Sequence, residues 1–277
     1  CIVRKHDGAA LYATSDLATL IEREKDYHPG HVIYVVDKRQ ELHFTQVFRV
    51  AKMTGIVGED TPLTFIGFGT MNGTDGKPFK TRDGGVMRLE MLISDVSEKV
   101  YEKILENRDI SEEEAREISK IIGLAAIKYG DLSNQATKDY VFDIDRFTSF
   151  EGNTGPYILY TIVRIKSILE KYAEQGNELS ANGKIVDFGS ESERSLKLVL
   201  TQFNDVMEAS YNELAPHRVC AYIYEVANAF NRFYHENNIM NEENADKQKS
   251  YINLLTLTKK VLEQCIDLLA IDAPERM

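Results

Sequence analysis

A glycine-rich, cationic loop that directly follows an apolar run is the feature that most constrains the fold. Leu63 to Phe68 is a short apolar run of the kind that forms a buried strand. The next segment, 67–85, contains six glycines and the tight-turn dipeptides Asn72-Gly73 and Asp75-Gly76. Its cations are Lys77, Lys80 and Arg82. A loop of this kind suits a polyphosphate ligand, although an exposed basic hairpin would show the same pattern.

The first 94 residues alternate helix-like and strand-like segments. Helical spacing over Leu11–Glu24 precedes the β-branched run Val32–Val36, which predicts a buried parallel strand. His28–His31 reads as the turn that opens this strand. A second helix should end at Gly55. Together with the apolar run at 63–68, this order predicts an α/β, partial Rossmann-like unit over 1–94.

Residues 95–277 show helical periodicity instead. A helix should begin at the capping residue Ser111 and stop at Gly130, and further helices are expected at 156–172, 192–212, 217–236 and 251–269. The pattern predicts a helical connecting segment over 95–145 and an all-α helical bundle over 146–277.

Polar side chains in the first unit suggest a binding site. Tyr12 and Asp16 are four residues apart, and a carboxylate beside a phenol suits a guanidinium group, although Asp16 could simply cap a helix. Gln40, His43 and Phe44 follow the strand at 32–36, and ligands of open α/β sheets bind at the carboxyl ends of strands. His43 could equally be a structural histidine, and Phe44 could be a core residue.

A second candidate surface lies on the helix at 156–172. Ile158, Ile162, Ile165 and Leu169 form its apolar stripe, whereas Tyr157, Tyr160 and Arg164 cluster on another side. Such a cluster suits stacking on unpaired bases, or packing against a neighbouring domain. On the helix at 217–236, Phe230 falls in the apolar stripe, and Tyr234 is the better candidate for a base contact.

Composition limits the classes of function. The net charge of −11 argues against nucleic-acid binding by bulk electrostatics, so RNA contacts must be local. No apolar run reaches the ~18 residues of a membrane span. The three cysteines are far apart, which indicates a reducing cytoplasm and no structural zinc site. A start at Cys1 inside an apolar run suggests a piece of a longer chain.

Several segments resemble the arginyl-tRNA synthetases, a family of class I aminoacyl-tRNA synthetases. These are ALYATSDLA at 10–18, KPFKTR at 77–82, NTGPYILY at 153–160 and APERM at 273–277. The resemblance implies that Lys77 and Lys80 act on the ATP phosphates as catalytic residues. It implies that Tyr12, Asp16 and Gln40 bind arginine, that His43, Phe44 and Gly69 help to bind ATP, and that Tyr157, Tyr160, Arg164, Tyr234 and Met277 bind tRNA.

The implied activity is ATP-dependent formation of arginyl-adenylate from L-arginine, followed by transfer to the 3′ end of tRNA(Arg). The resemblance implies a catalytic half followed by an anticodon-binding domain, ATP with Mg²⁺, no protein-bound metal, and a monomeric, cytoplasmic whole enzyme without membrane contact. The true H-x-G-H signature should lie far upstream of the arginine-binding segment, so His28–His31, which only mimics it, does not supply it. Because that upstream half is absent, we expect this C-terminal portion to make little adenylate alone. A non-catalytic tRNA-binding module, a different class I enzyme and a plain helical scaffold remain alternatives.

Overall fold

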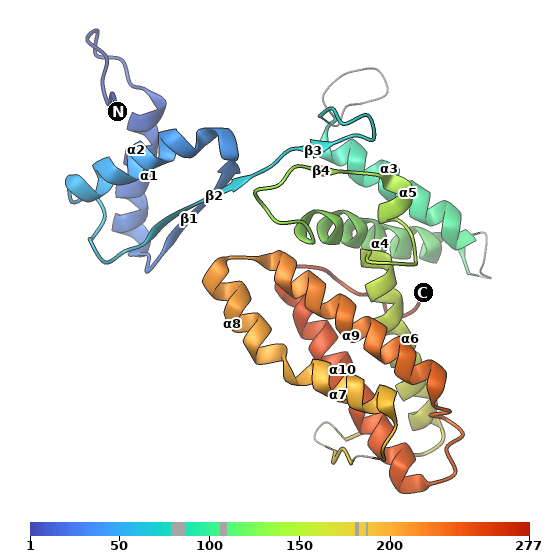
Figure 1. Ribbon diagram of the computed structural model, residues 1–277. Helices are drawn as coiled ribbons and strands as arrows, with labels where there is room; N and C mark the ends of the chain where they lie inside the picture. Colours follow the sequence, from blue (N-terminus) through green and yellow to red (C-terminus); the bar gives the residue numbers. More distant parts are fainter. Residues whose placement is uncertain (79–86, 106–109, 181–182, 187) are drawn as a thin grey trace. The chain divides into compact units, whose positions relative to one another are not determined.

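The computed structural model describes residues 1–78, 87–105, 110–180, 183–186 and 188–277 (Figure 1). The chain divides into two compact units. Unit 1 comprises residues 1–72 and 136–140, and unit 2 comprises 73–135 and 141–277. Nowhere in the described ranges is there a helix long and apolar enough to cross a membrane.

Unit 1 is a small α/β layer structure. Its elements are α1 (Tyr12–Tyr27), β1 (Val32–Asp37), the 3₁₀ turn η1 (Lys38–Gln40), α2 (Glu41–Met53), β2 (Leu63–Phe68) and the short β3 (Met71–Asn72). Strands β1 and β2 pair in parallel, with Val32 opposite Leu63. The parallel pair and its helices confirm the predicted α/β architecture.

The core of unit 1 lies between the two helices and the sheet. Leu17 and Leu20 of α1 pack with Val47 and Ala51 of α2 and with Val32 of β1. Strand β1 occupies the predicted residues, but the prediction that it is buried is wrong. The exposure of its side chains alternates: Val32 is buried, whereas Val35 is 61% exposed. Successive side chains of a strand point to opposite faces of the sheet, and the helices cover only one of these faces.

Unit 2 is a helical bundle. Its helices are α3 (Leu89–Leu105), α4 (Glu112–Leu132), α5 (Ile144–Phe147), α6 (Gly155–Glu174), α7 (Glu191–Thr201), α8 (Phe203–Glu213), α9 (Pro216–Glu236) and α10 (Ala245–Leu268). Strand β4 (Tyr140–Val141) begins at the last residue of unit 1, Tyr140, and pairs with β3 of that unit. The predicted stripe of α6 is buried as expected, together with Phe230 of α9. Ser111 caps α4 by accepting a hydrogen bond from the backbone of Glu114. The bundle thus confirms the predicted helical architecture after the α/β part.

Two expectations about helix ends are wrong. The segment 192–212 forms two helices, α7 and α8, which meet at Gln202. Helix α4 does not stop at Gly130 but continues to Leu132. Gly130 has a packing role instead, because a Cβ atom there would lie 2.0 Å from the ring of Phe147 on α5. A glycine in a helix can therefore mark a close contact rather than an end.

The close contact at Gly130 gives a stability test. Gly130→Ala should lower the free energy of unfolding by about 1–3 kcal/mol, because the added methyl group overpacks the α4–α5 contact and outweighs the helix propensity of alanine. Urea denaturation followed by circular dichroism measures the change. Lys120→Ala, at an exposed position of the same helix, is the control and should change stability little. Equal or greater stability of Gly130→Ala would contradict the proposed contact.

Candidate functional site

The structure pairs Asp16 of α1 with His43 of α2. His43 Nε2 and Asp16 Oδ2 are 2.6 Å apart, and the two side chains are 31% and 28% exposed. A ligand can thus reach the carboxylate while the imidazole holds one of its oxygens. The α1–α2 packing brings together two residues that the sequence separates by 27 positions. Both were named as candidates, but the sequence did not indicate that they would contact each other.

Aromatic side chains pack beside the Asp16–His43 pair. Phe44 is buried, with its ring centroid 4.7 Å from that of Tyr34 and 5.8 Å from that of Phe65, so it is a core residue beside the pair. Arg23 lies over the Tyr34 ring at 5.3 Å. Burial raises the pKa of the Tyr34 phenol, an effect that nearby Arg23 opposes and Asp16 reinforces. Tyr34 therefore stays neutral beside the carboxylate. Neither Tyr34 nor Arg23 was a sequence candidate, because each fits an ordinary strand or helix pattern.

Tyr12 and Gln40 occupy the edges of unit 1. Tyr12 is the first residue of α1 and is 87% exposed. Gln40 ends η1, immediately before α2, and is also exposed. Both side chains are thus open to a ligand. Their contacts with arginine stay predictions.

Asp139 joins the carboxyl ends of the two parallel strands. Its Oδ1 accepts a hydrogen bond from Lys38 Nζ, just after β1, at 2.8 Å, and one from the backbone N–H of Thr70, just after β2, at 2.7 Å. The Lys38 ammonium lowers the pKa of the Asp139 carboxyl, and the Thr70 bond adds to the effect. This link was missed because Asp139 lies 101 positions from Lys38.

Glycines allow the chain to close at the same edge. A Cβ atom at Gly67 would lie 2.8 Å from Lys38 Cα, and one at Gly69 would lie 2.3 Å from the carbonyl oxygen of Lys138. The N–H of Gly69 donates to the carbonyl oxygen of Ala136 at 2.8 Å. That N–H is therefore already used. The space beside its Cα is filled as well, by the Lys138 backbone, so Gly69 allows the close approach of that segment, and its contact with ATP stays a prediction.

Lys77 lies in a tight turn that belongs to unit 2. The Gly73 N–H donates to the Lys77 carbonyl oxygen at 2.7 Å, and the Lys77 N–H donates to Asp75 Oδ1 at 3.0 Å. Gly76 adopts the left-handed conformation, with φ of 73°, that the turn needs. The Lys77 side chain is exposed. Lys80 and Arg82 lie outside the described residues, so the predicted phosphate site is described only at Lys77.

The second candidate surface is well defined in unit 2. The guanidinium of Arg164 on α6 lies over the ring of Tyr160, 4.7 Å from its centroid, and over the ring of Tyr234 on α9, at 5.2 Å. Tyr157 donates its phenol proton to Asn228 Oδ1 at 2.8 Å, and burial raises the pKa of this phenol. The structure therefore brings four of the five predicted tRNA-binding side chains together on neighbouring helices.

Two asparagines of α9, Asn228 and Asn231, complete this surface and were not sequence candidates. Asn231 contacts Tyr157, Thr161 and Arg164 through its side-chain amide. A signal for them did exist. Asn228, Asn231 and Tyr234 recur at intervals of three, so they form a row along the helix beside its apolar stripe, and the Tyr234 ring lies 6.0 Å from that of Phe230.

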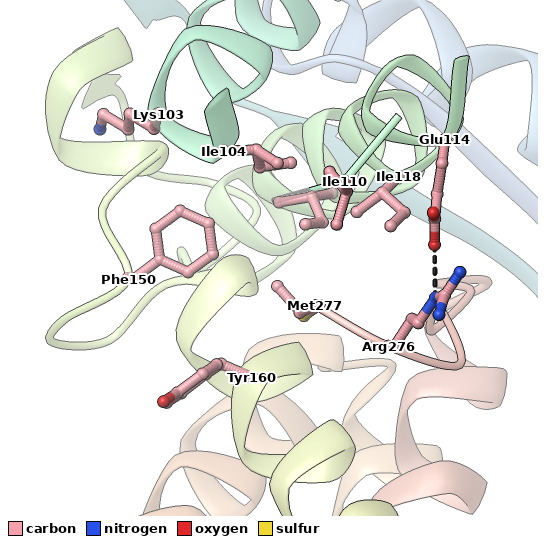
Figure 2. A pocket seen from close by; sticks show the side chains of 10 residues that line it. Lys103, Ile104, Ile110, Glu114, Ile118, Phe150, Tyr160, Arg276 and Met277 are labelled. Carbon is pink, nitrogen blue, oxygen red and sulfur yellow. Dashed lines mark hydrogen bonds and ion pairs between the residues drawn. The ribbon is translucent and has the colours of Figure 1, made fainter. Parts of the chain in front are cut away.

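The fifth predicted residue, Met277, lies at a pocket that Tyr160 also lines (Figure 2). The pocket has a volume of about 330 Å³, and its wall is mainly apolar. Its other lining residues are Lys103, Ile104, Ile110, Glu114, Ile118, Ile122, Phe150 and Arg276. An ion pair between Arg276 and Glu114 holds the C-terminal tail there, and Lys166 Nζ adds a contact to Glu275 at 2.9 Å. The tail thus packs against the helix that carries Tyr160.

Among the described residues, no group of three or more His, Cys, Asp or Glu side chains is placed to hold a metal ion. The groups available for ligand binding are instead a carboxylate–imidazole pair in unit 1 and a tyrosine–arginine surface in unit 2. The first suits a cationic side chain, and the second suits stacked bases.

Comparison with known proteins decides the family. Residues 1–144 match the family model described as "tRNA synthetases class I (R), catalytic domain", and residues 158–277 match the "DALR anticodon binding domain". The chain belongs to the class I arginyl-tRNA synthetase family. The family includes the two kinds of domain that the sequence predicted, in the predicted order.

Individual arginyl-tRNA synthetase relatives agree over the whole chain. It is 59% identical to an arginine–tRNA ligase of Agathobacter rectalis and 61% identical to one of Alkaliphilus oremlandii, with all of this chain covered in both. It spans 48% and 47% of their lengths, so about half of each relative. An arginyl-tRNA synthetase structure from Plasmodium falciparum is 27% identical, with a TM-score of 0.78, over 99% of this chain and 46% of that one. The Thermus thermophilus arginyl-tRNA synthetase shares the fold, with a TM-score of 0.79. It is 21% identical, and the match covers 100% of this chain and 51% of that one.

The Asp139 link can be tested by titration. Lys38→Met should raise the pKa of the Asp139 carboxyl, because it removes the hydrogen bond and the positive charge that lower it. Folding lowers the pKa of this carboxyl below its value of about 4 in the unfolded chain. The ionised carboxylate therefore stabilises the folded state above that pH, and this stabilisation is lost as the pH falls through the folded pKa. The variant should therefore lose less stability than the wild type on acidification.

Carbon-detected NMR titration of the Asp139 carboxyl measures this pKa directly. Lys5→Met, which replaces an exposed lysine elsewhere in unit 1, should leave it unchanged. An unchanged Asp139 titration in Lys38→Met would show that the two side chains do not pair in solution.

Proposed function

We propose that this chain serves arginine–tRNA ligation, in which ATP activates L-arginine and the arginine then passes to the 3′ end of tRNA(Arg). The observation that carries the proposal is the accessible Asp16 carboxylate, fixed by His43 in the part of the chain that matches the class I (R) catalytic model. A carboxylate that is fixed in place and accessible is the group that a guanidinium side chain pairs with best.

In this proposal a few residues share the work of the first step. Asp16, with Tyr12 and Gln40, would hold the guanidinium end of arginine. The carboxylate of the bound arginine then attacks the α-phosphorus of ATP, and the bond to the leaving pyrophosphate breaks. Lys77 and Lys80 would neutralise the charge that develops on the pyrophosphate. No protein nucleophile is needed, so the rate depends on positioning and on charge stabilisation.

The nucleotide would be held beside the same pair. His43 contacts Asp16, the Phe44 ring lies 5.0 Å from the His43 ring, and Gly69 directly follows the carboxyl end of β2. ATP would bring Mg²⁺, which adds positive charge at the phosphates. A monomeric whole enzyme in the cytoplasm is part of the same proposal and rests on the family alone.

The helical unit would bind the anticodon loop of tRNA(Arg). The support is the guanidinium of Arg164 between the rings of Tyr160 and Tyr234, with Tyr157 beside them and Met277 at the pocket that Tyr160 lines. Unpaired bases stack on aromatic rings and on guanidinium planes. Tyr160, Arg164, Tyr234 and Met277 lie within the part of the chain that matches the anticodon-binding model, and Tyr157 directly precedes it.

Asp16→Ala tests the arginine site in the whole enzyme. We expect the KM for arginine in ATP–pyrophosphate exchange to rise about a hundredfold, because two charge-assisted hydrogen bonds to the guanidinium are lost. Asp26→Ala removes an exposed carboxylate from the same helix and should leave the KM unchanged. An unchanged KM in Asp16→Ala would contradict the proposed role of Asp16, whereas wild-type exchange with another amino acid but not with arginine would favour a different class I enzyme.

Tyr160→Ala tests the RNA surface in this chain. We expect the affinity for a tRNA(Arg) anticodon stem-loop, measured by fluorescence anisotropy, to fall about 10- to 100-fold, the contribution of one stacked base. Tyr211→Ala is the matched control, because Tyr211 on α8 is 77% exposed and lies outside the surface. Equal affinity for Tyr160→Ala and wild type would favour the helical-scaffold alternative. Stem-loop binding by a whole enzyme that lacks exchange activity would favour the non-catalytic module.

A further inference from the structure

A single side-chain amide, that of Asn231 on α9, contacts three side chains of α6. Its Nδ2 donates to Tyr157 Oη at 2.9 Å and to Thr161 Oγ1 at 3.3 Å. Its Oδ1 accepts a hydrogen bond from Arg164 Nη1 at 2.8 Å. The amide therefore uses both donors and its acceptor on one stretch of the neighbouring helix.

The chemistry of the partners permits only one orientation of this amide. A guanidinium can only donate, so the atom that faces Arg164 must be the carbonyl oxygen of Asn231. The Thr161 hydroxyl donates its proton to the Tyr157 carbonyl at 3.0 Å, and the Tyr157 phenol donates its proton to Asn228. Both oxygens thus offer lone pairs to Asn231, and only its NH₂ group can satisfy them. A flipped amide would lose all three hydrogen bonds.

The charge of Arg164 is held without being neutralised. In the described part of the chain Arg164 forms no ion pair with a carboxylate, and its partners are the neutral Asn231 amide and the rings of Tyr160 and Tyr234. An acidic partner would fix the guanidinium equally well but would cancel its attraction for a nucleic acid. A neutral acceptor fixes the group and leaves its charge available.

We infer that Asn231 is the positioning residue of the RNA-binding surface, an inference that rests on the proposed anticodon role of unit 2. Asn231 acts through Arg164, which it holds between the two tyrosine rings before RNA arrives. A long arginine side chain otherwise samples many rotamers, and ordering it in advance removes that entropic cost from binding.

A double-mutant cycle tests whether Asn231 acts through Arg164. Asn231→Leu should weaken anticodon stem-loop binding about tenfold in the wild-type chain, because the bond to a charged partner is lost. In the Arg164→Met background the same substitution should change the affinity less than twofold, because the group that it positions is gone. Equal effects in both backgrounds would overturn the inference. Asn212→Leu on α8 is the control, since it makes the same chemical change at an exposed position.

A second measurement needs no RNA. Nitrogen-15 NMR should show slow rotation of the Arg164 guanidinium in the wild type and in Asn212→Leu, and fast rotation in Asn231→Leu. Asn231→Asp keeps the acceptor and should keep the rotation slow, which also provides a test if the leucine variant does not fold. Fast rotation in the wild type or in Asn231→Asp would overturn the inference. A wild-type chain that fails to bind the stem-loop would refute the proposed RNA role, while the NMR result would still decide whether Asn231 positions Arg164.

Discussion

Burial of one side of α6 is the constraint on which the larger unit depends. The apolar stripe of this helix, which ends at Leu169, packs against α4, α9 and α10, so the helix cannot rotate without exposing these side chains. The side chains on the other side of α6 are therefore fixed in position and in the direction in which they point. Tyr160 and Arg164 are presented toward Tyr234 because hydrophobic packing elsewhere on the same helix leaves them no other place. The tyrosine–arginine surface is thus a product of core packing.

In the smaller unit, hydrogen bonds between polar groups fix the ends of the strands. Two parallel strands alone leave open ends, and the segment that contains Asp139 returns to link Lys38 with Thr70. Gly67 and Gly69 permit the close approach that this link needs. The edge at which a nucleotide would bind is therefore braced by residues that need not touch a ligand. Substitutions there would disturb the site by loosening its frame.

Local periodicity was sufficient to predict most elements, because each helix buries a stripe and each strand is short and apolar. The fold class, strands β1 and β2 and the buried stripe of α6 could all be derived in this way. Contacts between distant residues could not. The Asp16–His43 pair, the Asp139 link and the role of Gly130 depend on which helices meet, and a single sequence does not encode that as a spacing. Asn228 and Asn231 are intermediate cases, since their spacing was visible but asparagine on a helix surface is usually solvated.

The arrangement of Arg164 between two rings has a further consequence for how an acidic chain could bind RNA. A net charge of −11 repels phosphates, and Arg164 is a guanidinium set among aromatic rings with no carboxylate partner in the described residues. Binding of this kind releases few counterions, so its strength should depend only weakly on ionic strength. Competition from bulk cellular RNA would be suppressed by the same repulsion, and selectivity would come from the shape of splayed-out bases rather than from charge.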